Sequence, residues 1–171
     1  MDIKKHLNVL NKKQRSSLLK FVNKKLTKIA GCPGLQTLPD LHHYKELKPL
    51  ATKLKKYITG NFGIIKCWAN HTDGGYISWH RHTSDLSVVY YLQNKESIGT
   101  IFYINNKIVP FESPQNSLVI FKNEIHSVPP RKKGTPKINR HSIAFEISMK
   151  GKNYLRGHYI PENVGYTRNA L

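Results

Sequence analysis

Two histidines, His80 and His82, lie one residue apart in the stretch WHRHTSDLSVVYYL at 79–92. In a β-strand, residues i and i+2 point to the same face of the sheet. Two imidazoles on one face can reach the same metal ion. The same spacing also fits a pair of solvated strand histidines, and neighbouring histidines occur elsewhere, at His42–His43. The pattern therefore indicates a candidate metal site, and a solvated pair is the alternative.

A third histidine and an arginine follow in comparable settings. The segment PQNSLVIFKNEIHSVPP at 114–130 is typical of a turn, a buried strand and then His126 after a short loop. Arg140 opens a later apolar run, RHSIAFEIS. An arginine that enters an apolar strand needs an anion or a carboxylate partner. The alternative is a charge at a strand end that pairs with Glu146 or is solvated.

Two helices are predicted before these residues. Residues 12–30 carry apolar side chains at helical spacing, and GCPG at 31–34 would end that helix. A second helix is predicted from about 41 to 57, with Asp40 as its N-cap and with Pro49 as a point where it would kink or split.

From residue 62 the pattern changes to short apolar runs separated by turn residues, which predicts strands. The runs are FGIIKCWAN, GYISWHRH, DLSVVYYLQ, GTIFYI, KIVPFE, SLVIF, EIHSV and HSIAFEISM. No segment of helix length separates them, so a parallel α/β fold is not expected. The predicted fold class is mainly β (α+β), an antiparallel sandwich or jelly roll with the two helices packed on one sheet.

Length and cysteine content narrow the class of protein. A chain of 171 residues suits a single domain with one core. No apolar run is long enough to span a membrane, and the polar N-terminus is not that of a secretory signal. Cys32 and Cys67 are isolated and form no disulfide framework, which favours a reducing compartment and a cytoplasmic location.

The chain is strongly basic, with a formal net charge of +18. Residues 1–60 hold 14 Lys+Arg and three acids. Such a surface attracts nucleic acid, anionic membrane or acidic proteins. Lysines outnumber arginines by 22 to 6, a bias typical of A+T-rich genomes, whereas proteins that read bases rely on arginine. A generally basic surface is therefore favoured over specific nucleic-acid binding, and an acidic substrate would suit it.

Several of these motifs together resemble the 2-oxoglutarate- and Fe(II)-dependent oxygenases. They are HxH at 80–82, LSVVYYL, PxNSLVIF leading to His126-Ser-Val, and RxSIAF from Arg140. The nearest branch is the prolyl-hydroxylase-like group, with its small phage and bacterial members. The resemblance implies a double-stranded β-helix (jelly roll) catalytic core at 62–148. Residues 1–60 would be a helical support region and 149–171 a C-terminal extension of one domain, 1–171.

The resemblance also implies a site and a reaction. Fe(II) would bind His80, His82 and His126. Arg140 and Tyr91 would hold the far carboxylate of 2-oxoglutarate. Asn70 and Tyr76 match positions that line the pocket in relatives. With O2, a substrate C–H bond would be hydroxylated and 2-oxoglutarate converted to succinate and CO2.

One departure from the family pattern concerns the second ligand. The common motif is HxD or HxE, and His82 stands at the carboxylate position. Three histidines can still bind Fe(II) on one face, with one negative charge fewer than the usual triad. Asp85 could replace His82 only through a bulge, because it lies on the opposite face of a regular strand. In a third reading His82 does not bind, and water or an anion fills its place.

Two rival functions come from other classes. A metal-binding cupin that does not use 2-oxoglutarate shares the opening Gly74, five residues and HxH, but Leu86 and Ser87 stand where its glutamate is expected. A non-catalytic basic module would bind nucleic acid through the helical region. The substrate stays open between prolyl or other peptide residues, a nucleobase and a small molecule. Glu146 stands where nucleic-acid repair oxygenases carry a further arginine, which disfavours that branch.

The other residues near the motifs are expected to take no part in the chemistry. Trp68 and Trp79 are expected in the core rather than in the pocket. His141 is expected to be solvated. The run RKK at 131–133 is expected in a solvated loop near the mouth of the pocket.

Overall fold

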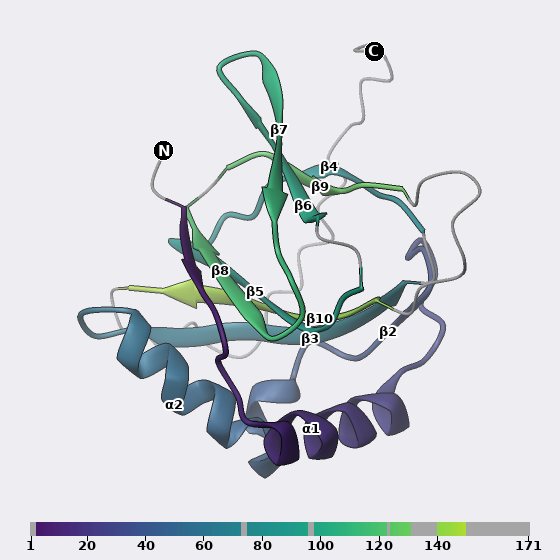
Figure 1. Ribbon diagram of the computed structural model, residues 1–171, viewed down its shortest axis with the longest axis vertical. Coiled ribbons are helices and arrows are strands. Elements are labelled where there is room, and N and C mark those ends of the chain that lie inside the picture. The colour runs from purple at the N-terminus through teal and green to yellow at the C-terminus, as the bar shows by residue number, and fades with distance from the viewer. Residues whose placement is uncertain (1–2, 73–74, 96–97, 123, 131–139, 150–171) are drawn as a thin grey trace.

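The computed structural model describes residues 3–72, 75–95, 98–122, 124–130 and 140–149. In chain order the strands of this part are β1 (Lys4–His6), β2 (Leu35–Gln36), β3 (Gly63–Thr72), β4 (Ile77–His80), β5 (Leu86–Gln93), β6 (Ile98–Ile104), β7 (Lys107–Glu112), β8 (Ser117–Phe121), β9 (His126–Val128) and β10 (Arg140–Ser148). They form a six-stranded sheet in the order β1-β8-β5-β10-β3-β2 and a four-stranded sheet in the order β4-β9-β6-β7 (Figure 1).

Every strand pair named in these two sheets is antiparallel. The smaller sheet lies across one face of the larger one, and the helices cover the opposite face (Figure 1). This is the predicted double-stranded β-helix with supporting helices. Each of the eight predicted β runs overlaps one of the strands β3 to β10. The assignment of all 171 residues to one domain stays a prediction.

Helix α1 (Lys12–Lys25) begins with a capping box. The Asn11 side chain accepts a hydrogen bond from the backbone of Gln14 (2.9 Å), and the Gln14 side chain accepts one from the backbone of Asn11 (3.0 Å). These bonds satisfy two of the donors that a helix N-terminus leaves without intrahelical partners.

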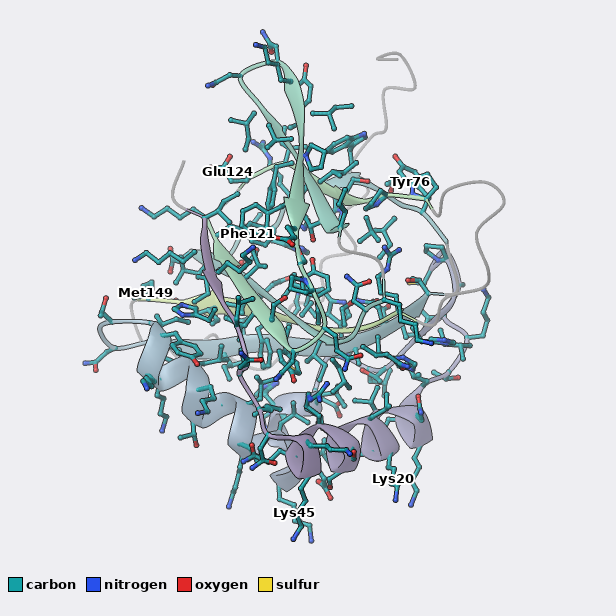
Figure 2. All side chains as sticks on the ribbon, viewed as in Figure 1. Lys20, Lys45, Tyr76, Phe121, Glu124 and Met149 are labelled. Carbon is teal, nitrogen blue, oxygen red and sulfur yellow. The ribbon has the colours of Figure 1, made fainter. Side chains whose placement is uncertain are left out.

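The apolar faces of α1 and of α2 (Lys48–Tyr57) pack against the larger sheet. Leu18 and Val22 in α1, and Leu50 and Leu54 in α2, are spaced four apart and are buried. They join a core cluster with sheet residues such as Ile143. The lysines of α1 are exposed on the side away from this core. Figure 2 shows Lys20 and Lys45 pointing away from the sheet.

Both predicted helices are too long. α1 ends at Lys25 rather than near residue 30, because Thr27 exchanges backbone hydrogen bonds with Gln36 and the chain is extended from Leu26. The predicted helix from residue 41 is also wrong in its first part.

Residues 41–47 form two short 3-10 turns, and α2 begins at Lys48 with Pro49 in its first turn, where a missing N–H costs nothing. The Asp40 side chain makes no capping hydrogen bond.

The first 60 residues contribute more than helices. β1 pairs with β8, and β2 pairs with β3, so the N-terminal region supplies both edge strands of the larger sheet. The side chain of Asn116 holds the segment that joins β1 to α1. It accepts a hydrogen bond from Leu10 N and donates one to Leu10 O, at 3.0 and 2.9 Å.

A smaller apolar cluster fills part of the space between the two sheets. It consists of Tyr91, Phe102, Val119 and Phe121, all buried. Cys32 and Cys67 are both free thiols, as the sequence predicts. No helix in the part of the chain described here is long and apolar enough to cross a membrane.

Candidate active site

The structure brings the three predicted histidines together. His80 ends β4 and His126 begins β9, and the two residues are partners in register. His82 follows two residues after His80, beyond the end of β4, so the predicted strand through His82 stops short. One ring nitrogen from each histidine lies within 4.8 Å of the others. Of the described residues, no other group of three or more His, Cys, Asp or Glu side chains lies close enough to hold a metal ion.

Backbone carbonyls fix the rings of His80 and His126. His80 Nδ1 lies 2.7 Å from the Ser78 carbonyl oxygen, and His126 Nδ1 lies 2.9 Å from that of Glu124. A carbonyl oxygen only accepts, so each Nδ1 carries the proton that it donates. The Nε2 lone pair of each ring is then left for another partner, as metal-binding histidines require.

A carboxylate fixes the third ring. His82 Nδ1 lies 3.1 Å from Glu146 Oε1, and Lys66 Nζ lies 3.4 Å from Glu146 Oε2. The same Nδ1 atom is therefore engaged in all three histidines, and the same Nε2 atom is left.

Burial keeps two of these three histidines neutral. It lowers the pKa of His80, and together with the charge of His80 it lowers the pKa of His126 to about 3. Burial alone would raise the pKa of the Glu146 carboxyl, but the hydrogen bond and charge of His82, with Lys66, hold that pKa below its usual value. At neutral pH the site therefore presents neutral imidazoles at His80 and His126 and a charged carboxylate behind His82.

Arg140 lies in the same pocket as the histidines, at the start of β10. Its side chain is buried, with the residue 4% exposed. Nε donates to the Thr72 hydroxyl at 3.0 Å, and Nη2 donates to the Gly75 carbonyl at 3.2 Å. The alternative of a solvated strand-end charge is therefore wrong. Pairing with Glu146 is wrong as well, because that carboxylate contacts Lys66 and His82 instead.

Tyr91 is fully buried on β5 and lines the same pocket as Arg140. Its hydroxyl group is hydrogen-bonded to that of Thr100. Burial raises the pKa of Tyr91, so the side chain stays a neutral phenol. The ring lies close against Gly99, where an added Cβ atom would come within 2.1 Å of Tyr91 Cε1. Only a glycine at position 99 leaves room for this ring.

The pocket that holds these groups lies between the two sheets and has a volume of about 670 Å³. His80, His126, Arg140 and Tyr91 line it from strands of both sheets, and His82 lines it from the segment after β4. The segment 28–33, after α1, lines it as well. This arrangement places a candidate metal site and a buried cation in one cavity.

Searches against family models and against curated proteins find no match to this chain. Solved structures do match. A prolyl hydroxylase from Trichoplax adhaerens, solved with a hypoxia-inducible factor peptide, shares 16% identity over 91% of this chain and 87% of its own, with a TM-score of 0.67.

HygX from Streptomyces hygroscopicus, solved with nickel, 2-oxoglutarate and hygromycin B, shares 9% identity over 87% of this chain and 83% of its own, with a TM-score of 0.68. A prolyl-4-hydroxylase from Pseudomonas putida shares 14% identity over 87% and 93%, with a TM-score of 0.61.

The chain has the fold of the 2-oxoglutarate- and Fe(II)-dependent oxygenases. The side chains in the cavity fit a divalent metal ion and a carboxylate ligand. Three imidazoles with their Nδ1 atoms already bonded match the donor set of a divalent transition metal. A buried guanidinium in the same cavity matches a dicarboxylate cosubstrate.

Glu146 is the residue of this oxygenase-fold site that sequence reasoning missed. The sequence pattern suggests Glu146 only as a partner for Arg140 and as a residue that disfavours a nucleic-acid repair enzyme. A signal was available, because Arg140, Ser142, Ala144 and Glu146 alternate along β10, and the first three line the pocket. Because residues two apart in a strand share a face, Glu146 is expected on the face of β10 that lines the pocket.

The two pocket residues carried over from the oxygenase pattern are both in the lining. Asn70 Oδ1 accepts a hydrogen bond from Gln36 Nε2 at 2.9 Å. Tyr76 is 43% exposed, and Figure 2 shows its side chain at the periphery, near the start of β4. Trp68 also lines the pocket, with its ring centroid 5.7 Å from that of His82. Trp79 instead packs edge-on against Tyr103.

Contacts decide two further expectations. Asp85 does not replace His82, because its carboxylate accepts hydrogen bonds from Met149 N (2.8 Å) and Ser148 Oγ. His141 is not solvated. It is 4% exposed, and its Nε2 lies 2.9 Å from Asn23 Oδ1. The run at 131–133, Gly74 and residues 150–171 lie outside the described residues.

Proposed function

We propose that this protein is an Fe(II)- and 2-oxoglutarate-dependent oxygenase that hydroxylates a C–H bond of its substrate. One observation carries the proposal: a triad of histidines, a buried arginine and a buried tyrosine line the same cavity of an oxygenase fold. The overall reaction converts 2-oxoglutarate, O2 and R–H into succinate, CO2 and R–OH, which balances in atoms. A prolyl or other peptide residue, or a small molecule, is the proposed substrate class.

The metal ion would be held by His80, His82 and His126. Fe(II) held there would supply the redox chemistry with O2, and 2-oxoglutarate would be bound through its keto-acid end. The protein's own contribution is orientation. Carbonyl oxygens of Ser78 and Glu124 hold two of the rings, so the Nε2 atoms are presented without a search through ring rotamers.

Arg140 and Tyr91 would bind the other end of 2-oxoglutarate. The guanidinium is held by Thr72 and Gly75, and it supplies a positive charge in a buried place where a charge-assisted hydrogen bond is strong. The neutral Tyr91 hydroxyl adds a donor beside it. Asn70 and Tyr76, which also line the cavity, would contact the substrate.

The test is an anaerobic titration of apo-protein with Fe(II) and then with 2-oxoglutarate, followed by the weak visible charge-transfer band of the Fe(II)–keto-acid chelate. We expect the band in the wild type and its loss in His126→Ala. Arg140→Ala should weaken 2-oxoglutarate binding about 10- to 100-fold, the value of a buried charge-assisted bond, and Arg140→Lys should weaken it less. His43→Ala, at an exposed position, is the matched control.

The same titration separates the rival functions. Iron binding without a band, together with no succinate formed from 2-oxoglutarate in air, would favour a cupin-type metal protein and overturn the proposal. Absence of iron binding would also overturn it. A non-catalytic basic module that binds nucleic acid would then be the favoured function. It predicts a salt-dependent affinity for nucleic acid, which is lost when four lysines of the helical region are neutralised: Lys12, Lys13, Lys24 and Lys25.

A further inference from the structure

His82 differs from its two partners in what holds its Nδ1 atom. Backbone carbonyls hold His80 and His126, whereas the Glu146 side chain lies 3.1 Å from His82 Nδ1. His82 is also the ligand candidate that lies outside a strand. Backbone geometry therefore fixes it less than it fixes the other two, and a side-chain contact takes that role.

The Glu146 carboxylate is itself fixed. One oxygen faces His82, and the other lies 3.4 Å from Lys66 Nζ, so the group bridges the pocket and the outer surface. Its side chain is 10% exposed, while that of Lys66 is 47% exposed. A carboxylate held at both oxygens in such a place has little freedom to turn away from the imidazole.

A carboxylate behind a metal-binding histidine does two things. It sets the ring orientation and tautomer, and it makes the imidazole a stronger donor. In this site it also affects charge, because three neutral imidazoles bring none to a divalent cation. The carboxylate of Glu146, 3.1 Å from His82 Nδ1, can then supply negative charge to the site through that candidate ligand.

We propose that Glu146 is a positioning residue of the metal site. Its contact with His82 Nδ1 orients the His82 ring and makes its Nε2 atom a stronger electron donor to the metal ion. This inference rests on the proposed function, because it presupposes that His80, His82 and His126 bind a metal ion. It explains how a site with histidine in place of a directly bound carboxylate can still hold a divalent cation. The pairing of His82 with Glu146 restores the negative charge one hydrogen bond further out.

The experiment uses Co(II), which is stable in air at neutral pH and has visible bands that report on its ligands. We expect Glu146→Gln to bind Co(II) about 10-fold more weakly than the wild type and to shift those bands. Glutamine has nearly the same shape, so the thermal unfolding midpoint of the apo-protein should change little. Glu112→Gln is the matched control, because Glu112 also pairs with a lysine, Lys5, but is exposed and does not line the pocket. Its Co(II) affinity should equal that of the wild type.

A double-mutant cycle then tests whether Glu146 acts through His82. In a His82→Ala background, Glu146→Gln should weaken Co(II) binding no further, because the ring that couples the two is gone. An equal loss in both backgrounds would overturn the inference, since the carboxylate would then act on the cation without the imidazole. Unchanged affinity and bands in Glu146→Gln alone would overturn it as well.

The two proposals fail in different ways. A wild-type protein that binds no Co(II) would overturn the metal site and therefore the proposed function. A wild-type protein that binds Co(II) normally, with Glu146→Gln indistinguishable from it, would overturn only the role of Glu146.

Discussion

His80 and His126 face each other in register across β4 and β9, with their ring centroids 4.2 Å apart. Each Nδ1 atom donates backward to a carbonyl oxygen two residues earlier in its own chain segment. The strand pair and these local bonds together hold both rings before any ligand arrives.

This relationship predicts the tautomer of the apo-protein. Both rings should be neutral with the proton on Nδ1, because only a donor satisfies the carbonyls of Ser78 and Glu124. Long-range 15N–1H correlation spectra at pH 7 distinguish the two tautomers and the charged ring. His126 should remain neutral at pH 5, since its pKa is lowered to about 3 by burial and by His80. A protonated His126 at pH 5, or a proton on Nε2, would contradict the geometry.

Gly99→Ala should damage the 2-oxoglutarate end of the pocket. The added methyl group would lie 2.1 Å from the Tyr91 ring, so the ring must move away. We expect 2-oxoglutarate affinity to fall about 10-fold, with a destabilisation of about 1–3 kcal/mol from overpacking. Co(II) affinity should stay unchanged, because the three atoms nearest to the added Cβ all belong to Tyr91. Gly63→Ala is the control, since a Cβ atom there meets nothing within 4 Å.

His141 should make stability depend on pH. Burial, with the charge of His71, lowers the pKa of His141 to about 4. The folded state then binds fewer protons than the unfolded state between about pH 6.5 and pH 4. The stabilisation from a neutral His141 is present above pH 6.5 and is lost as the pH falls to 4.

The variant His141→Gln removes this contribution. Its unfolding free energy in urea should fall less steeply than that of the wild type over the same window, by roughly 1–3 kcal/mol in total. Parallel curves for the two proteins would show that His141 titrates alike in the folded and unfolded states.

Asn116→Ala should be strongly destabilising. Besides its two bonds to Leu10, Asn116 Oδ1 accepts a hydrogen bond from the Tyr90 hydroxyl at 2.9 Å. Its φ of 64° is also a conformation that asparagine and glycine tolerate better than alanine.

We expect urea unfolding of Asn116→Ala to show a loss of about 3 kcal/mol or more, because buried partners are left unbonded. Asn116→Gly should lose about 1 kcal/mol less, since it relieves the backbone and loses the same bonds. Equal losses in the two variants would mean that the backbone conformation contributes nothing.

The strands could be predicted because their signals are local. Apolar runs bounded by turn residues match β3 to β10, and Pro110 lies in β7, at the edge of the smaller sheet, where the sequence pattern permits a proline. The histidine triad and Arg140 could be proposed because the motifs that carry them are compact.

The remaining features depend on contacts that no local pattern encodes. β1 has only three residues, and its partner β8 lies more than 100 positions later in the chain, so its sequence does not indicate a strand. The end of α1 is set by the pairing of Thr27 with Gln36, which overrides the helical spacing of residues 26–30. Glu146 was missed because its partner, His82, comes from a segment outside any strand.

The position of β10 in the larger sheet has a consequence for how the protein is made. β10 is the last strand in the described part of the chain, yet β3 and β5 both pair with it, on its two sides. A growing chain on the ribosome can pair β5 with β8 and β1, and β2 with β3, but these two halves stay apart until residues 140–148 emerge. Until then β3 and β5 each expose an unpaired strand edge. Such edges promote aggregation of incompletely folded β proteins. β10, which joins the two halves, begins with Arg140. The guanidinium group therefore enters the pocket in the same step that completes the larger sheet.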